Sequence, residues 1–260
     1  MKKFITTISI ILSSFILTTS AFGDDHAEPQ YGALEGYFCN YNKGKGLSDV
    51  LKVAGEWDEW ADSNMSVNYS AWVMTPHVNN PEDFPYDYFW LGVADNHEAL
   101  GTVNDEWMAK GAKIQKKWEA IEVCDSHNLM TGLMARPFQS TTGHAFVQIS
   151  GCELNDGKTL QDLMVADKQW AKWMDEVGMP GGLLRWLPFA GDSRDSTTDL
   201  YSVYLTESIV TRRKAHDMMI KGCAAVLQST YDDVMSCDTP RIYHSTSVAV
   251  KKSASVISIV

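Results

Sequence analysis

The sequence predicts an α+β protein in which two copies of one β-α-β-β-α-β unit follow each other along the chain. Three observations support this prediction: a repeated motif, the same order of elements in both halves, and cysteines at matching places. The motif C-x2-N-x-G-K-x-L-x-D-x7-W-x2-W begins at Cys39 and again at Cys152, so that each matched pair is 113 residues apart. A register maintained from the cysteine to the second tryptophan indicates an internal duplication.

In the first unit, residues 34–41 are expected to form a strand and residues 47–61 a helix, because apolar side chains recur there at helical spacing. That stripe contains Leu47, Val50, Leu51, Ala54, Trp57 and Ala61. Alternating or continuous apolar runs predict strands at 67–76, 86–94 and 128–137. A second helical stripe covers 107–121.

The second unit repeats this order. Strands are expected at 145–154, 182–189, 199–207 and 241–250, and helices at 160–177 and 211–228. The β-α-β-β-α-β order is that of the ferredoxin-like unit, whose sheet has the strand order 4-1-3-2 and carries both helices on one face. Two such sheets can bury their uncovered faces against each other. The expected units are 32–138 and 144–250, joined by a linker at 139–143.

The N-terminal sequence predicts export. Two lysines precede an apolar stretch over 4–17 and then small residues, which is typical of a secretory signal peptide. A membrane helix needs about 20 apolar residues, so a retained anchor is the less favoured alternative. The expected segments are a signal peptide at 1–23, a flexible leader at 24–31 and a tail at 251–260. The mature protein is then periplasmic or secreted and has no membrane attachment.

The charge of the chain argues against nucleic acid as a partner. The formal net charge is −11, and no basic stripe stands out in the sequence. Nucleic-acid-binding proteins normally present such a stripe. Attraction to anionic lipid is disfavoured for the same reason.

Four cysteines form matching pairs. Cys39 and Cys124 are 85 residues apart, as are Cys152 and Cys237. In each unit the first cysteine ends strand 1 and the second precedes strand 4, and these strands are antiparallel neighbours in the expected topology. In an oxidising compartment this predicts the disulfides Cys39–Cys124 and Cys152–Cys237. Four free thiols are the alternative, and Cys223, which has no counterpart, is expected to be a buried thiol.

With this topology the chain resembles the dimeric α+β barrel superfamily, which includes the antibiotic-biosynthesis monooxygenases. The resemblance covers nearly the whole mature chain at the level of topology. It implies a barrel formed within one chain by the two paired sheets. The superfamily contains cofactor-free oxygenases, haem-handling enzymes, isomerases and proteins without known activity, and no catalytic motif of any member is present here. Fold alone therefore does not fix function.

Strand alternation predicts which side chains face the barrel interior. Leu34 and Phe38 fit the helix-covered face, whereas Glu35 and Tyr37 fit the interior. The candidate ligand-binding residues are Glu35, Tyr37, Tyr88, Gln148, Arg185, Tyr201, Arg241, Tyr243 and His244. Tyr88 and Tyr201 are expected at equivalent positions of strand 3. Glu35 is a candidate general base, and a hydrogen-bonded structural carboxylate is the alternative.

Two functions remain open on this evidence. The first is binding of a small apolar or aromatic molecule in the barrel interior or in a helix–sheet cleft. The second is a cofactor-independent monooxygenase or isomerase. The paired tryptophans of the motif, such as Trp57 and Trp60, are expected in the core, with a ligand-binding surface as the alternative. No cofactor is predicted, because the sequence has no nucleotide-binding loop and no clustered histidines.

One metal site is conditional on signal cleavage. Cleavage after Gly23 would give a mature terminus of Asp24-Asp25-His26, whose amine, amides and imidazole can hold Cu(II) or Ni(II) in a square plane. Cleavage after Ala21 would move His26 to the fifth position and remove the site. No other metal site is expected.

Overall fold

The computed structural model of the protein describes residues 31–138 and 143–249. The elements of the first half are β1 (Tyr31–Tyr41), α1 (Leu47–Asn64), β2 (Tyr69–Val78), β3 (Tyr88–Ala94), α2 (His97–Lys110), α3 (Ala112–Glu119) and β4 (Glu122–Arg136). The elements of the second half are β5 (His144–Leu154), α4 (Leu160–Glu176), β6 (Gly182–Ala190), β7 (Leu200–Thr206), α5 (Ile209–Met218), the π-helical turn η1 (Met219–Cys223), α6 (Ala224–Tyr231), β8 (Met235–Cys237) and β9 (Arg241–Ala249). The predicted signal peptide, leader, linker and tail lie largely or wholly outside the described residues, and so does the conditional metal ligand His26.

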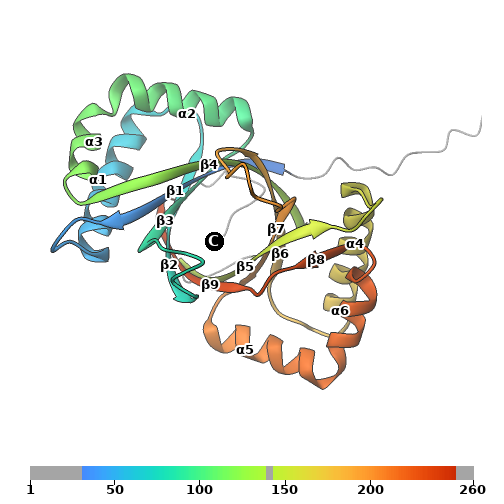
Figure 1. Cartoon of the computed structure of the whole chain (residues 1–260). Coiled ribbons are helices and arrows are strands. Elements are labelled where there is room, and N and C mark those ends of the chain that lie inside the picture. Colours follow the sequence, from blue (N-terminus) through green and yellow to red (C-terminus); the bar gives the residue numbers. More distant parts are fainter. Residues whose placement is uncertain (1–30, 139–142, 250–260) are drawn as a thin grey trace, which may run out of the picture.

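The strands form one sheet that closes on itself. Their order is β7-β6-β4-β1-β3-β2-β9-β5-β8, and β7 also pairs with β5. This last pairing closes every strand except β8 into an eight-stranded antiparallel barrel. Helices α1–α3 lie outside one side of the barrel, and α4–α6 lie outside the opposite side (Figure 1). The predicted α+β class is therefore confirmed.

The barrel interior is packed with apolar side chains. Leu34, Trp72, Leu91 and Val147 are fully buried there, and the cluster includes residues from both halves. The expected assignment of strand faces is wrong, because Leu34 lies inside the barrel and Glu35 lies under the helices. The physical reason is that a closed interior excludes water, so the more uniformly apolar set of alternating residues occupies it.

The outer face of the barrel packs against the helices in two further cores. In the first half, α1 buries Val50, Ala54, Trp57 and Ala61, as its helical periodicity predicts. Trp57 is 5% exposed and contacts the rings of Tyr69 and Trp90 at centroid distances of 5.7 and 4.9 Å. In the second half, α4 buries the equivalent Trp170. Both tryptophans are thus core residues, and both also border the clefts described below.

Two predicted helices are interrupted at a glycine. In the first half, α2 ends and α3 begins around Gly111, where a Cβ atom would lie 2.5 Å from the Trp107 ring. This helical region starts at His97, earlier than the predicted 107, because Asn96 caps it by accepting a hydrogen bond from the Ala99 amide at 2.9 Å. In the second half, Gly222 has a φ of 135°, and the helix is broken there into α5, η1 and α6.

The last strand of each half also differs from the expectation. In the first half, β4 begins at Glu122, so Cys124 lies within the strand and not before it. In the second half, the corresponding segment is divided into β8 and β9 by a short stretch that contains Pro240. Proline lacks the amide hydrogen that a continuous strand would use, which explains the break.

Both predicted disulfides are present. Cys39 is bonded to Cys124, and Cys152 is bonded to Cys237. The strand register places each pair directly opposite, in β1–β4 and in β5–β8. Cys223 is a free thiol as expected, but it is partly exposed and not buried, because it lies in the irregular turn η1. Within the described residues, no helix combines the length and apolar character needed to cross a membrane.

We expect the double substitution Cys39→Ser, Cys124→Ser to lower the free energy of unfolding by about 2–4 kcal/mol, since it releases a long loop in the unfolded chain. Urea unfolding followed by tryptophan fluorescence measures the change. Cys223→Ser is the matched control and should leave the unfolding midpoint unchanged. An unchanged midpoint in the double variant would contradict a stabilising role for the bond.

Candidate functional site

Two clefts lie between the helices and the outer face of the barrel, one in each half. The first cleft has a volume of about 430 Å³ and is bordered by strands β1–β4 and helices α1–α3. Its aromatic wall consists of Tyr37, Trp57, Tyr69, Tyr88, Trp90, Trp107 and Trp118. The second cleft, of about 540 Å³, is bordered by β5–β8 and α4–α6.

Glu35 is the central polar residue of the first cleft. Alternation along β1 turns its side chain toward the helices, where it is only 3% exposed. Its carboxylate accepts hydrogen bonds from the Tyr69 hydroxyl at 2.6 Å and the Asn104 amide at 3.1 Å, and it contacts the His127 ring nitrogen at 3.1 Å. A buried carboxylate with these partners is held in one position and can accept a proton or a hydrogen bond from a ligand.

Two tyrosines complete this network. Trp90 donates its ring N–H to the Tyr69 hydroxyl at 3.1 Å, so donors are ordered from Trp90 through Tyr69 to Glu35. Burial raises the pKa of Tyr69, and the negative charge of Glu35 raises it further. Burial and Glu35 raise the pKa of Tyr37 in the same way, and its ring stacks on His127 at 3.9 Å. Both phenols are therefore protonated donors at neutral pH.

Gly92 creates the space that Tyr69 needs. A Cβ atom at Gly92 on β3 would lie 1.7 Å from the Tyr69 hydroxyl oxygen. Ala71 of β2 pairs with Gly92, which places Tyr69 diagonally across from it. A side chain at position 92 would push the Tyr69 ring away from Glu35, so the network depends on this glycine.

Glu122, at the other end of the first cleft, differs from Glu35 because it has no proton donor. It is 9% exposed, and its Oε2 atom is buried without a hydrogen-bond partner in the described structure. The sulfur nearest to its other oxygen, at 3.6 Å, is that of Cys124, which carries no hydrogen because it is in a disulfide. Burial raises the pKa of this carboxyl from 4.5 to about 8.

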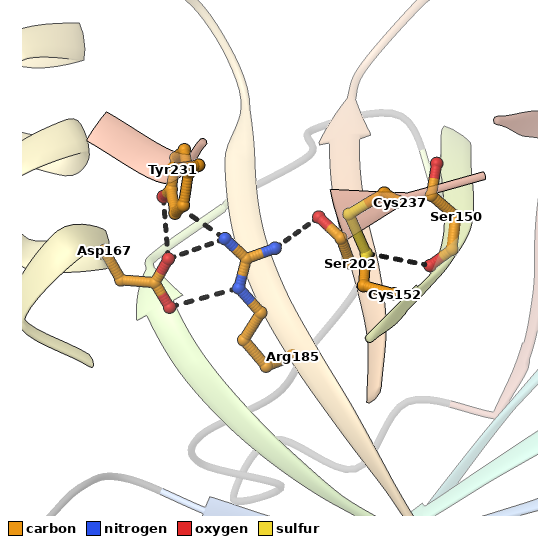
Figure 2. A network of polar contacts seen from close by, with 7 residues as sticks. All are labelled: Ser150, Cys152, Asp167, Arg185, Ser202, Tyr231 and Cys237. Carbon is orange, nitrogen blue, oxygen red and sulfur yellow. Dashed lines mark hydrogen bonds and ion pairs between the residues drawn. A yellow bond between two sulfur atoms is a disulfide. The ribbon is translucent and has the colours of Figure 1, made fainter. Parts of the chain in front are cut away.

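The second cleft contains a buried ion pair in place of a free carboxylate (Figure 2). Arg185 on β6 donates to the two carboxylate oxygens of Asp167 on α4, at 3.1 and 2.6 Å. It also donates to the Tyr231 hydroxyl at 3.2 Å and to the Ser202 hydroxyl. Tyr231 in turn donates to Asp167 at 2.7 Å. Removing one partner of such a buried pair costs about 3–5 kcal/mol, because the other charge is left uncompensated.

Arg212 on α5 is a second cation in this cleft. It donates to the side-chain oxygen of Gln148 at 2.9 Å and lies over the Tyr204 ring at 5.5 Å. Burial lowers its pKa. No carboxylate pairs with it among the described residues. His216, also on α5, borders the same cleft.

The predicted site residues do not converge on one place. Glu35, Tyr37 and Tyr88 border the first cleft, and Gln148 and Arg185 border the second. Tyr243 and Tyr201 belong to the barrel interior or pack against it. Arg241 pairs with Asp238 at 2.8 Å, and the ring of His244 lies 5.3 Å from that of His144.

The expected equivalence of Tyr88 and Tyr201 is wrong. Tyr88 pairs with Cys39, whereas the residue that pairs with Cys152 is Leu200. The two halves differ by one residue between strands 1 and 3, so Tyr88 faces the helices and Tyr201 faces the interior. A shift of one residue reverses the face of a strand.

Several residues of the clefts were not predicted, although two of them carry a sequence signal. Asp167 occupies an apolar position of α4, between Leu163 and Trp170, where a charged residue requires a partner. Asn104 similarly adjoins Val103 and Trp107 on α2. Tyr69, Gly92 and His127 carry no such signal, because only the register of three strands brings them to Glu35.

The structure is similar to solved proteins of the dimeric α+β barrel superfamily. No family model and no curated protein matches the sequence. A provisionally assigned monooxygenase from Lactobacillus acidophilus NCFM is 9% identical, with 85% of this chain and 95% of that chain covered and a TM-score of 0.52. A mutant chlorite dismutase from Candidatus Nitrospira defluvii is 8% identical, with 85% and 93% covered and a TM-score of 0.50. The chain therefore has the dimeric α+β barrel fold, and the predicted resemblance is confirmed.

The expectation that no cofactor is involved is contradicted by these comparisons. Structures similar to this chain include a heme-binding protein from Thermus thermophilus, which is 7% identical with 85% and 94% covered and a TM-score of 0.47. The donors that accept or anchor haem are imidazole, thioether or phenolate for the iron and arginine for the carboxylates. The second cleft has this donor set, in His216, Met219, Tyr204 and Arg212, and is the place where haem would fit. Among the described residues, no histidine borders the first cleft.

We expect Glu122→Gln to stabilise the protein above neutral pH. The folded state favours the protonated carboxyl, whose pKa is raised to about 8, so the stabilisation is complete below the unfolded value of 4.5 and is lost as pH rises through 8. The variant should therefore match the parent at pH 4 and exceed its unfolding free energy by about 1–3 kcal/mol at pH 9. Urea unfolding at both pH values tests this. Glu119→Gln, an exposed neighbour, is the control, and a Glu122→Gln gain at pH 4 would contradict the assignment.

Proposed function

We propose that this protein binds a small apolar or aromatic molecule in the first cleft, between the barrel and helices α1–α3. The observation that carries the proposal is a cavity of about 430 Å³ with seven aromatic side chains around a buried, hydrogen-bonded carboxylate. Ligand sites are typically concave, mostly apolar and equipped with few polar groups. The barrel interior, which is packed with core side chains, supports this role less well.

A cofactor-independent monooxygenase or isomerase is an extension of the same proposal. The supporting observation is that Glu35 is fixed by Tyr69 and Asn104 inside the cleft, where it can accept a proton from a bound ligand. The likeness to a provisionally assigned monooxygenase is compatible with this role and supports only the fold. Conversion of the ligand would separate this enzyme from a binding protein.

We infer that the chain consists of two tandem ferredoxin-like units, 32–138 and 144–250. The strand order β4-β1-β3-β2 in the first half and β9-β5-β7-β6 in the second supports the duplication. The 85-residue separation of both disulfides supports it as well. Export of the protein is a further proposal, supported by the N-terminal sequence and by disulfides that are typical of oxidising compartments.

Haem binding in the second cleft is a second candidate function. His216 and Arg212 on α5 would hold the iron and a carboxylate, respectively, while Arg185 stays neutralised by Asp167. When bound, haem supplies redox-active iron whose reactivity depends on its axial ligand and on pocket polarity. The volume of about 540 Å³ and the mostly apolar lining support this candidate.

For the first cleft, we expect naphthalene to quench tryptophan fluorescence saturably. Trp107→Ala should weaken this binding about tenfold, because it removes a partly buried wall of the cleft. Trp173→Ala is the matched control, since Trp173 is partly buried on α4 and does not border either cleft. Absence of binding by the parent protein, or equal losses in both variants, would contradict the proposal. Mass spectrometry of the titrated ligand shows whether it is converted.

For the second cleft, we expect haemin to bind the purified protein and to give an absorption band in the Soret region. His216→Ala should shift this band and lower haemin affinity about tenfold, since axial ligation is lost. His77→Ala, at an exposed position of β2, is the control. If His216→Ala retained the parent spectrum and affinity, haem would not be held by the second cleft.

A further inference from the structure

The two clefts occupy the same place in their halves but present opposite charges. The acidic residues Glu35, Glu119 and Glu122 border the first cleft, and no lysine, arginine or histidine of the described chain lines it. Arg185, Arg212 and His216 border the second, and Asp232 is the acidic residue there. Gln148 stands 113 residues after Glu35, so the central carboxylate of the first cleft is replaced by a neutral amide in the second.

Glu122 is the group that points to a ligand. Glu35 already has donors on both oxygens, in Tyr69 and Asn104. Glu122 has none within the part of the chain that the structure describes, although it is nine-tenths buried in the cavity wall. Its two neighbours are the sulfurs of the Cys39–Cys124 disulfide, which can neither donate a proton nor act as thiolate ligands for a metal. A buried carboxyl without a partner is costly, and a cationic ligand would offset that cost.

We propose that the ligand of the first cleft is an organic cation, with an ammonium group on an apolar or aromatic body. This inference rests on the proposed binding function of the same cleft. The aromatic wall supplies ring faces, which attract ammonium groups through cation–π interactions. The carboxylate of Glu122 supplies a full opposite charge beside the apolar surface. Together they favour an ammonium group over a neutral group of the same shape.

The geometry of the wall fits this chemistry. Trp90 is central, because its ring contacts those of Trp57 and Trp118 at centroid distances of 4.9 and 5.5 Å, in edge-to-face arrangements. These three tryptophans are each less than 10% exposed, so a cation beside them would be largely removed from water. Cation–π attraction is stronger under such desolvated conditions.

The test compares two compounds of the same shape and different charge. Phenyltrimethylammonium and tert-butylbenzene are titrated into the purified protein at pH 8.5, with tryptophan fluorescence as the readout. We expect the cation to bind at least about tenfold more tightly than the neutral compound. Glu122→Gln should remove this preference and leave the affinity for tert-butylbenzene unchanged. Glu119→Gln, which alters an exposed carboxylate at the rim, should retain the preference.

The outcomes separate the two levels of the proposal. Equal affinities for both compounds in the parent protein would overturn the cation inference and leave small-molecule binding intact. Binding of neither compound would contradict the proposed function of the cleft itself. A preference for the cation that persists in Glu122→Gln would exclude Glu122 as the recognising charge. Loss of the preference in Glu122→Gln alone would support the inference.

Discussion

Closure of the barrel is the constraint on which the rest of the structure depends. Strand pairings β4–β6 and β2–β9 join the two halves, and β5–β7 and β1–β3 continue the sheet within each half. Because the ring has no free edge, every barrel strand is paired on both sides. The enclosed space is too dry for polar side chains, so alternating strand residues divide into an apolar inner set and a more polar outer set. Both clefts are built from the outer set.

The architecture was predictable because its signals are local and repeated. Helical stripes, apolar strands and paired cysteines each report on their own segment, and the register between halves checks one against the other. The assignment of strand faces failed for a physical reason: it treated helix cover as the driest environment, whereas the closed interior is drier. A sequence pattern of period two defines two faces but does not say which of them is enclosed.

The candidate site was predictable only in part. Glu35 stands out as a charged residue in an apolar strand, and its burial follows from that placement. Its partners Tyr69, Asn104 and His127 come from β2, α2 and β4, so only the register of the folded sheet brings them together. Gly92 shows the same limit, since its role is to leave space for a ring two positions away on the adjacent strand. Distances of this kind are properties of the tertiary structure.

A single chain encodes both clefts separately, and this removes a restriction that symmetric assemblies face. In a dimer of identical subunits, every substitution appears at both equivalent positions, so both pockets must change together. Here Glu35 and Gln148 vary independently, as do Gly92 and its counterpart in the second half. Selection can therefore adjust one pocket while the other keeps its chemistry, and the barrel that joins them tolerates two unlike ligands within one molecule.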